Sequence, residues 1–285
     1  MASTGTSSQS TKLEASTFQR LHPRAYFERF LAEGIRTDGR EALGWRGVNV
    51  NVGSISTADG SALVRLGDTT IVCGVKAEIA QPNLERPDEG FIVPNIDLPA
   101  ICSPKFKPGA PGEEAQVISD RINEILLSSG VIPLSSLCIH PKKAAWVLYI
   151  DATCINYDGN VIDATLIAVM AALKNTRIPV PTFDEEAGTT ICSRVNKVSL
   201  TITRTPLSAS FAVFDGTHLL ADPSAFEEPL IETSVTVVVD EHGELASVTQ
   251  VGVGSLAGGS QSMSECIKAA KQRRRQLGEL VGEIS

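Results

Sequence analysis

The sequence has few aromatic residues and no excess of positive charge. Only 5% of its 285 residues are Phe, Tyr or Trp, and 33 acidic against 25 basic side chains give a formal net charge of −8. Binding nucleic acid by bulk charge needs clustered Lys and Arg, and binding single strands also needs aromatic faces for base stacking. The composition therefore argues against a free-standing RNA-binding module.

Long apolar runs, paired cysteines and clustered histidines are also missing. No apolar stretch approaches the roughly 18 residues of a membrane-spanning helix, and the Ser/Thr-rich N-terminus has no apolar segment after basic residues. The six cysteines form no Cys-x-x-Cys pair, and the four histidines have no metal-ligand spacing. We expect a soluble protein in a reducing compartment, with no membrane contact, metal or cofactor.

The largest apolar mass lies in the middle of the chain. The run Trp146–Ile150, continued by Ala152–Ile155, predicts a central strand buried on both faces. The residues Tyr157–Asn160 are typical of a turn, and apolar residues at helical spacing from Ala164 to Leu173 predict a helix buried nearly all round. This strand and helix should form the core of the fold.

The turn before this helix could in principle bind an anion, because helix N-termini present free N–H groups. Such a site needs help from a cation, and the turn instead carries Asp158 and Asp163, which repel phosphate. Val161 and Ile162 cannot donate hydrogen bonds from their side chains. A purely structural turn is therefore the favoured interpretation.

The elements predicted before this centre form a helix, a three-stranded meander and a second helix. A long proline-containing loop at residues 81–112 separates the meander from the second helix. The predicted helices span Arg24–Glu33 and Glu113–Leu127, and the predicted strands span Val48–Val52, Ala62–Leu66 and Thr70–Lys76.

The elements predicted after the centre repeat this order. A polar connector at Lys174–Gly188 leads to strands, and a capping box at Ser262–Glu265 starts a last helix. The predicted strands span Val195–Thr203, Ala209–Phe214, Leu219–Ala221, Ser234–Val239 and Glu244–Gln250. Two similar halves indicate an α+β fold. We divide the chain into a disordered tail (1–20), an N-terminal half (21–180) and a C-terminal half (181–285).

Five motifs in a fixed order point to a known family. They are RTDGR at Arg36–Arg40, the meander at Val50–Glu78, VPNIDLP at Val93–Pro99, PGEEAQVIS at Pro111–Ser119, and the centre at Ala145–Ala164. With them the chain resembles the RNase PH-like ring subunits of the eukaryotic RNA exosome. The resemblance implies an RNase PH-like fold of two pseudo-symmetric halves, in a six-membered ring around a channel for single-stranded RNA.

The same resemblance locates the site of the catalytic members, which degrade RNA by phosphorolysis. Their phosphate-holding Gly-Thr-Arg turn falls on Asn160–Ile162, so that Ile162 stands where the arginine belongs. Their two aspartates fall on Glu228 and Ser234. These departures imply a degenerate site with no catalytic residue.

The positions that hold RNA in the family are also altered. Two of its arginines fall on Ile125 and Ser128, and only Arg121 keeps a charge along that helix. Another candidate for RNA contact is the loop with Lys105, Phe106 and Lys107, where two cations flank an aromatic face. In the alternative interpretation this loop is solvated and Phe106 packs against its own domain.

The resemblance implies a non-catalytic exosome ring subunit that supports 3′–5′ RNA processing and decay. It also implies the partners: other RNase PH-like ring subunits, S1/KH cap subunits, a hydrolytic nuclease, and single-stranded RNA in the channel. The expected locations are nucleus, nucleolus and cytoplasm. The alternative is a phosphorolytic 3′–5′ exoribonuclease with an atypical site, in which Glu228, Asp222 and Asp240 would bind magnesium. These carboxylates otherwise belong to a solvated acidic loop.

Overall fold

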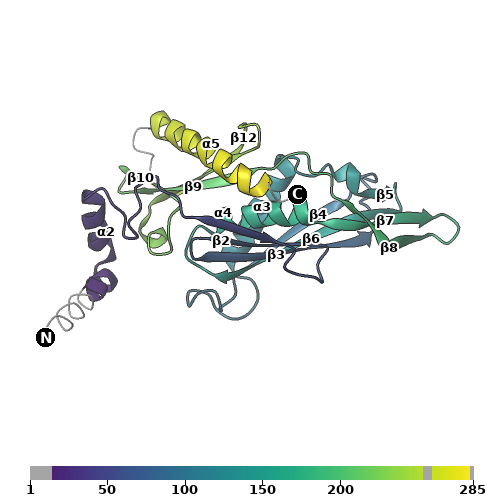
Figure 1. Cartoon of the computed structure of the whole chain (residues 1–285), viewed down its shortest axis with the longest axis horizontal. Helices are drawn as coiled ribbons and strands as arrows, with labels where there is room; N and C mark the ends of the chain where they lie inside the picture. Colours follow the sequence, from purple (N-terminus) through teal and green to yellow (C-terminus); the bar gives the residue numbers. More distant parts are fainter. Residues whose placement is uncertain (1–14, 253–258, 283–285) are drawn as a thin grey trace.

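The computed structural model of the chain describes residues 15–252 and 259–282. Its layers follow in the order first sheet, helices α3 (Glu113–Ser128) and α4 (Val161–Asn175), second sheet, and helix α5 (Ser260–Gly282), as Figure 1 shows. This arrangement confirms the predicted α+β fold, in which each half has an antiparallel meander and a long helix.

The first sheet contains the predicted meander. Its strands are β1 (Val48–Val52), β2 (Gly60–Leu66), β3 (Thr69–Ala80), β6 (Ala144–Asn156) and β4 (Phe91–Asp97), in that spatial order. All neighbours are antiparallel except β4, which runs parallel to β6. A short 3₁₀ helix, η1 (Leu134–Leu137), leads into β5 (Cys138–His140), which also pairs with β6.

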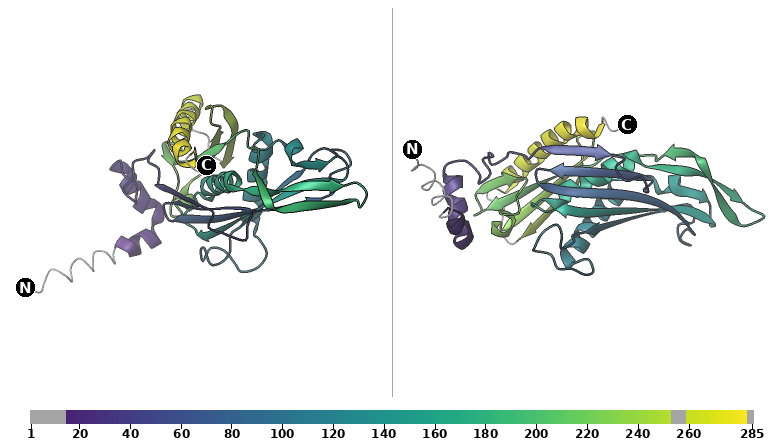
Figure 2. Two further views of the ribbon diagram at one scale, coloured as in Figure 1. Left: turned by 45° about the vertical axis from the view of Figure 1, so that its right-hand side comes forward. Right: turned by 60° about the horizontal axis from the view of Figure 1, so that its bottom comes forward.

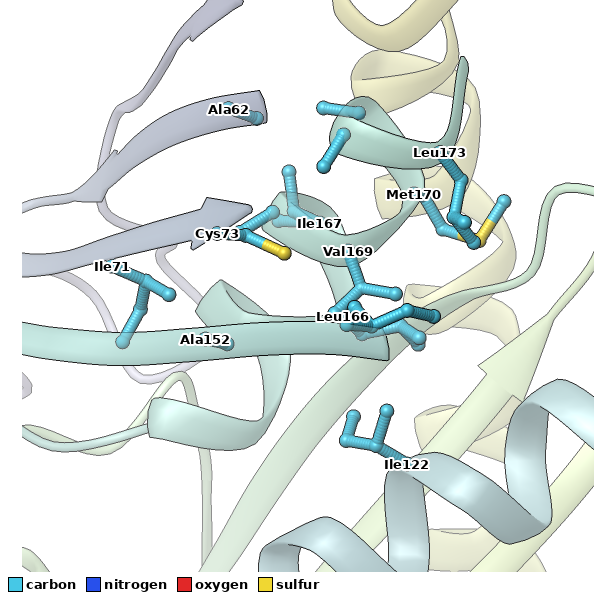
Figure 3. Packing of buried hydrophobic residues seen from close by; sticks show 14 of the residues in the cluster. Ala62, Ile71, Cys73, Ile122, Ala152, Leu166, Ile167, Val169, Met170 and Leu173 are labelled. Carbon is cyan, nitrogen blue, oxygen red and sulfur yellow. The ribbon is translucent and has the colours of Figure 1, made fainter. Parts of the chain in front are cut away.

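Helix α4 is buried nearly all round, as the sequence predicts. Its residues Leu166, Val169 and Met170 are fully buried. It lies between the two sheets, with strands β2 and β3 on one side and β9 (Leu207–Phe214) on the other. Figure 3 shows its apolar side chains among residues of β2, β3, β6 and α3. Because both sheets need an apolar partner, every face of this helix has to be apolar.

Strand β6 is central, but the prediction that both of its faces are buried is wrong for its second half. Residues from Ala144 to Leu148 are buried, whereas Tyr149 and Ile155 are 38% and 47% exposed. The cause is that α3 and α4 pack against one face of the first sheet (Figure 2), so that alternate side chains on the other face reach the surface.

The second sheet has the strand order β10 (His218–Ala221), β9, β11 (Thr233–Val239) and β12 (Leu245–Gly252), all antiparallel. Helix α5 packs Cys266 and Ala270 against its outer face. The predicted capping box at Ser262–Glu265 lies inside α5, because the helix begins at Ser260. With Ser262 as the N-cap, the prediction placed the first helical residue at Met263, three residues late.

The predicted polar connector is instead a strand, β7 (Arg177–Asp184), which pairs with β8 (Thr189–Ser199) in a separate two-stranded sheet. This hairpin projects from the body of the molecule (Figures 1 and 2). Pro179 and Pro181 misled the prediction. They are tolerated because, among the described strands, β7 pairs only with β8, and the pairing shifts register between the two prolines.

The predicted disordered tail also needs correction at its end. Residues 15–21 are helical, just before helix α2 (Pro23–Ala32). Phe18 supports this turn, because its ring contacts His22 and Tyr26 and lies under the Arg29 guanidinium. Residues 1–14 lie outside the described part of the chain. Among the described residues, no helix is both long and apolar enough to cross a membrane.

Candidate functional site

A cleft of about 540 Å³ lies where α3, the N-terminus of α4 and the second sheet meet. Its walls combine apolar side chains, several hydroxyl groups and a charged rim. The predicted positions Lys105, Arg121, Ile162, Glu228 and Ser234 all line it. The structure thus brings together residues more than a hundred positions apart in the sequence. Their roles in RNA binding or in a degenerate catalytic site stay predictions.

The turn that enters α4 has a left-handed backbone at two successive residues. Gly159 has φ +77°, and a Cβ there would lie 2.6 Å from the backbone of Ser224 and Ala225. Asn160 follows with φ 52° and ψ 47°, a conformation that Asn adopts more readily than most residues. Ile162 is half-buried and packs against the core. The turn therefore places an apolar side chain at the position where the resemblance predicts a cation in catalytic members.

A carboxylate of the chain itself lies at this helix N-terminus. The backbone N–H of Asn160 donates to Glu228 Oε1 at 2.8 Å, and the Tyr157 hydroxyl donates to Glu228 Oε2. Glu228 begins a short 3₁₀ helix, η2 (Glu228–Leu230). Burial raises the pKa of Glu228 and, helped by the Glu228 charge, the pKa of Tyr157. Tyr157 therefore stays protonated and acts as the donor.

Lys105 is held at the rim of the cleft. Its Nζ lies 2.8 Å from Glu114 Oε2 and 3.4 Å from the Tyr157 hydroxyl. It also lies 5.0 Å and 5.3 Å from the ring centroids of Tyr157 and Phe106. The two rings meet edge to face at 5.2 Å. Phe106 therefore packs against its own domain, as the alternative interpretation of this loop proposed.

The other candidate RNA contacts differ in exposure. Lys107 is exposed, whereas Arg121 is half-buried on α3 and faces the cleft lining. Ile125 and Ser128 are the positions where the resemblance predicts family arginines. Ile125 is buried in the core, and Ser128 is exposed at the end of α3. Among the described residues, only Arg121 and Lys105 bring positive charge to the cleft lining, and Lys105 is already paired with Glu114.

Behind the turn lies a dense set of buried polar contacts, which we call the polar junction. It consists of Arg46, Asn160, Asp163, Ser208, Ser210 and Asp222. Asp222 is fully buried, and its two carboxylate oxygens accept from the Arg46 guanidinium at 2.7 Å and 2.9 Å. The Asn160 amide donates to Asp222 at 2.7 Å and to Asp163 at 2.8 Å. These contacts connect the two halves of the chain.

The two carboxyl groups of the junction have opposite pKa shifts. Burial alone would raise the pKa of Asp222, but hydrogen bonds and the charge of Arg46 outweigh it and hold that pKa below its ordinary value. Burial raises the pKa of Asp163, although Asn160, Ser208 and Ser210 all donate to it. The difference follows from the partners, since only Asp222 contacts a cation.

A second buried ion pair lies close by. Arg36, the first residue of the RTDGR motif, is fully buried and donates through two nitrogens to the Glu227 carboxylate. It also donates to the carbonyl oxygens of Ala221 and Asp222, at 2.6 Å and 3.0 Å. The motif therefore fixes the segment before β1 to the loop after β10.

The proposed magnesium site is contradicted. Asp222 is enclosed by Arg46, Arg40 and Asn160, and Asp240 accepts the N–H groups of His242 and Glu244 in the turn after β11. Among residues 15–252 and 259–282, no group of three or more His, Cys, Asp or Glu could hold a metal. Sequence proximity suggested a cluster, but burial beside arginines gives Asp222 a structural role.

Sequence reasoning missed Tyr157, Glu114 and Arg46. Tyr157 was assigned only to a turn, Glu114 only to the predicted helix Glu113–Leu127, and no motif marked Arg46. Their roles depend on contacts with residues 9 to 176 positions away. A signal was present only for Tyr157, since an aromatic residue in an otherwise polar turn often has a packing partner.

Comparison with known proteins gives matches over most of the chain. Residues 44–179 match the "3' exoribonuclease family, domain 1" and residues 205–273 match domain 2 of that family. The Schizosaccharomyces pombe protein "Exosome complex component rrp43" is 39% identical, over 90% of this chain and 94% of the relative. The Thermococcus gammatolerans protein "Exosome complex component Rrp42" is 34% identical, over 90% and 93%.

Solved structures agree with these matches. A chain of the Archaeoglobus fulgidus exosome with RNA bound to the active site superposes with a TM-score of 0.80 and 29% identity, covering 90% of this chain and 96% of that one. A chain of an archaeal exosome core gives 0.77 and 27%, covering 91% and 96%. Rice Rrp46, at 17% identity and a TM-score of 0.65, shares the fold.

Proposed function

Because the chain belongs to the 3′ exoribonuclease family with the RNase PH fold, we propose that it is a non-catalytic subunit of an exosome ring. One observation carries this proposal. At the N-terminus of α4, where phosphate is held in catalytic members, the chain has Ile162 in place of a cation and the carboxylate of Glu228 on the free N–H.

Phosphorolysis needs the attacking phosphate to be positioned and its charge to be offset. Loss of one cationic clamp from a phosphoryl-transfer site lowers the rate by roughly 10³-fold or more. Here the clamp is absent, a carboxylate lies at the anion position, and Ser234 provides no carboxylate on β11. These changes act on the same step, so restoring a single group should not restore activity.

The subunit would instead complete the ring and guide single-stranded RNA to a separate hydrolytic nuclease. The similarity to proteins named exosome complex components, and to chains of exosome cores, supports ring subunits and RNA as partners. We further propose S1/KH cap subunits and the hydrolytic nuclease as partners, and nucleus, nucleolus and cytoplasm as locations. Native mass spectrometry of the tagged chain from its own cell extract would identify these partners.

The test of inactivity is RNA degradation by the purified full chain with phosphate and magnesium. We expect no phosphate-dependent release of nucleoside diphosphates, from either the natural chain or the Ile162→Arg variant. An active relative of the family, assayed in the same buffer, is the positive control. Release by a contaminant-free preparation of the natural chain would instead establish an atypical phosphorolytic exoribonuclease.

A further inference from the structure

The Glu228 carboxylate has the contacts that a bound anion would have in this cleft. It accepts the Asn160 N–H at the start of α4, where the helix dipole favours negative charge, and it accepts the Tyr157 hydroxyl. The positive charge of Lys105 favours the ionised form of this carboxylate and so partly offsets the rise in the pKa of Glu228 that burial causes. An inorganic phosphate ion at this helix end would compete for the same donors.

We infer that Glu228 is an internal anion, which excludes inorganic phosphate from the cleft by occupying its position. This inference rests on the proposed lack of catalysis and extends it. The cleft lacks the cation that would hold phosphate, and the Glu228 carboxylate also occupies the place where phosphate would bind. Glu228 reaches the helix end from the first residue of η2.

The surroundings explain why the carboxylate remains there. The neighbouring Pro223–Ala225 backbone lies directly against Gly159, which fixes the loop that carries Glu228 close to the turn. In the same loop, the Ser224 N–H donates to Glu227, and Glu227 is paired with buried Arg36. The position of Glu228 is therefore set by the contacts that hold the two halves together.

The inference predicts an order of effects in phosphate binding. Ile162→Arg alone should not create a phosphate site, because the new guanidinium would pair with Glu228. Adding Glu228→Gln removes the charge but keeps a similar shape. Adding Glu228→Ala also empties the position and should bind phosphate most tightly, by at least about tenfold over Ile162→Arg alone.

The experiment measures binding of inorganic phosphate to the full chain by ³¹P NMR titration, with sulfate as a second anion. Glu186→Gln in the Ile162→Arg background is the matched control, because it removes the same charge from the exposed β7–β8 tip. Thermal melting checks that every variant folds, and the Gln variant keeps the comparison available if the Ala variant is unstable.

Equal phosphate affinity in Ile162→Arg with and without the Glu228 substitutions would overturn the inference, and so would phosphate binding by the natural chain. The proposed function is judged separately, by release of nucleoside diphosphates. An active natural chain would refute the absence of catalysis. An inactive chain whose variants gain no phosphate binding would refute only the internal anion.

Discussion

The N-terminus of α4 borders two polar regions, the polar junction and the cleft, that use their charges differently. In the junction Asp222 is fully buried, and its carboxylate contacts two arginines and an amide. In the cleft Arg121 is half-buried, and Lys105 is paired at the rim. Removing one partner of a buried ion pair costs several kcal/mol, whereas rim charges contribute little. The cleft can therefore change its chemistry without unfolding the protein, and the junction cannot.

The largest expected effect comes from breaking the junction. Asp222→Asn should lower the free energy of unfolding by about 3–5 kcal/mol, because it removes the buried counter-ion of Arg46 and leaves only the partly exposed Asp158. Asn is the conservative choice, since residue 222 has φ 50° and Asn tolerates this conformation. Urea unfolding of the full chain, monitored by circular dichroism, measures the loss.

The matched substitution in the cleft is Ser234→Ala. Ser234 is half-buried on β11 and lines the cleft, and its change should stay within about 0.5 kcal/mol. If both variants lose the same stability, the two regions do not differ as described.

A smaller effect should appear in the pH dependence. The folded-state pKa of Asp222 is below its ordinary value of 3.8, so its contribution is present at neutral pH and is lost as the pH falls through about 4 and below. Asp222→Asn should make the free energy of unfolding depend less on pH at the acidic end. Urea unfolding between about pH 3 and about pH 7 measures this dependence, because that range brackets the ordinary pKa of an aspartate.

Asp163 supplies the contrast for this measurement. Its folded-state pKa is raised, so its contribution favours the folded state at low pH and is lost as the pH rises through that pKa. Asp163→Asn should therefore make the loss of stability on acidification steeper. The same slope in both variants would contradict the opposite roles of the two carboxyl groups.

The smallest effect concerns RNA at the rim of the cleft. If the loop guides RNA, Lys107→Glu should flatten the salt dependence of RNA protection by the assembled ring by about one phosphate contact. Lys105→Glu should change it less, because Lys105 is already paired with Glu114. Lys143→Glu, an exposed change in the turn before β6, is the control. An unchanged slope for Lys107→Glu in a correctly assembled ring would exclude the loop from the RNA path.

The fold could be predicted for elements whose sequence pattern directly reflects their burial, either on one face or all round. The alternation in β1 and the apolar surface of α4 each have one structural explanation, and both predictions are confirmed. Strand β7 was missed because it contains prolines, which strands accept mainly at the edge of a sheet. Whether a strand lies at an edge depends on its pairing in the folded protein, which the sequence pattern does not reveal.

The candidate site could be located only through the family motifs. They placed Ile162, Glu228 and Ser234 together, and the structure brings these three residues into one cleft. Motifs did not reveal that Glu228 contacts Asn160, or that Asp222 belongs to a buried ion pair, because both contacts join segments more than 60 residues apart. Charge patterns along the chain are similar for a solvated loop and for a buried network.

The left-handed turn at Gly159 and Asn160 limits which residues its backbone accepts. A side chain at position 159 would collide with the opposite backbone, and position 160 suits few residue types, so both sites can drift very little. The residue at position 162 follows the turn and does not set its backbone, so its charge can differ while the turn stays the same. The same turn is therefore compatible with different chemistry at position 162, so the shape of its backbone does not by itself indicate activity.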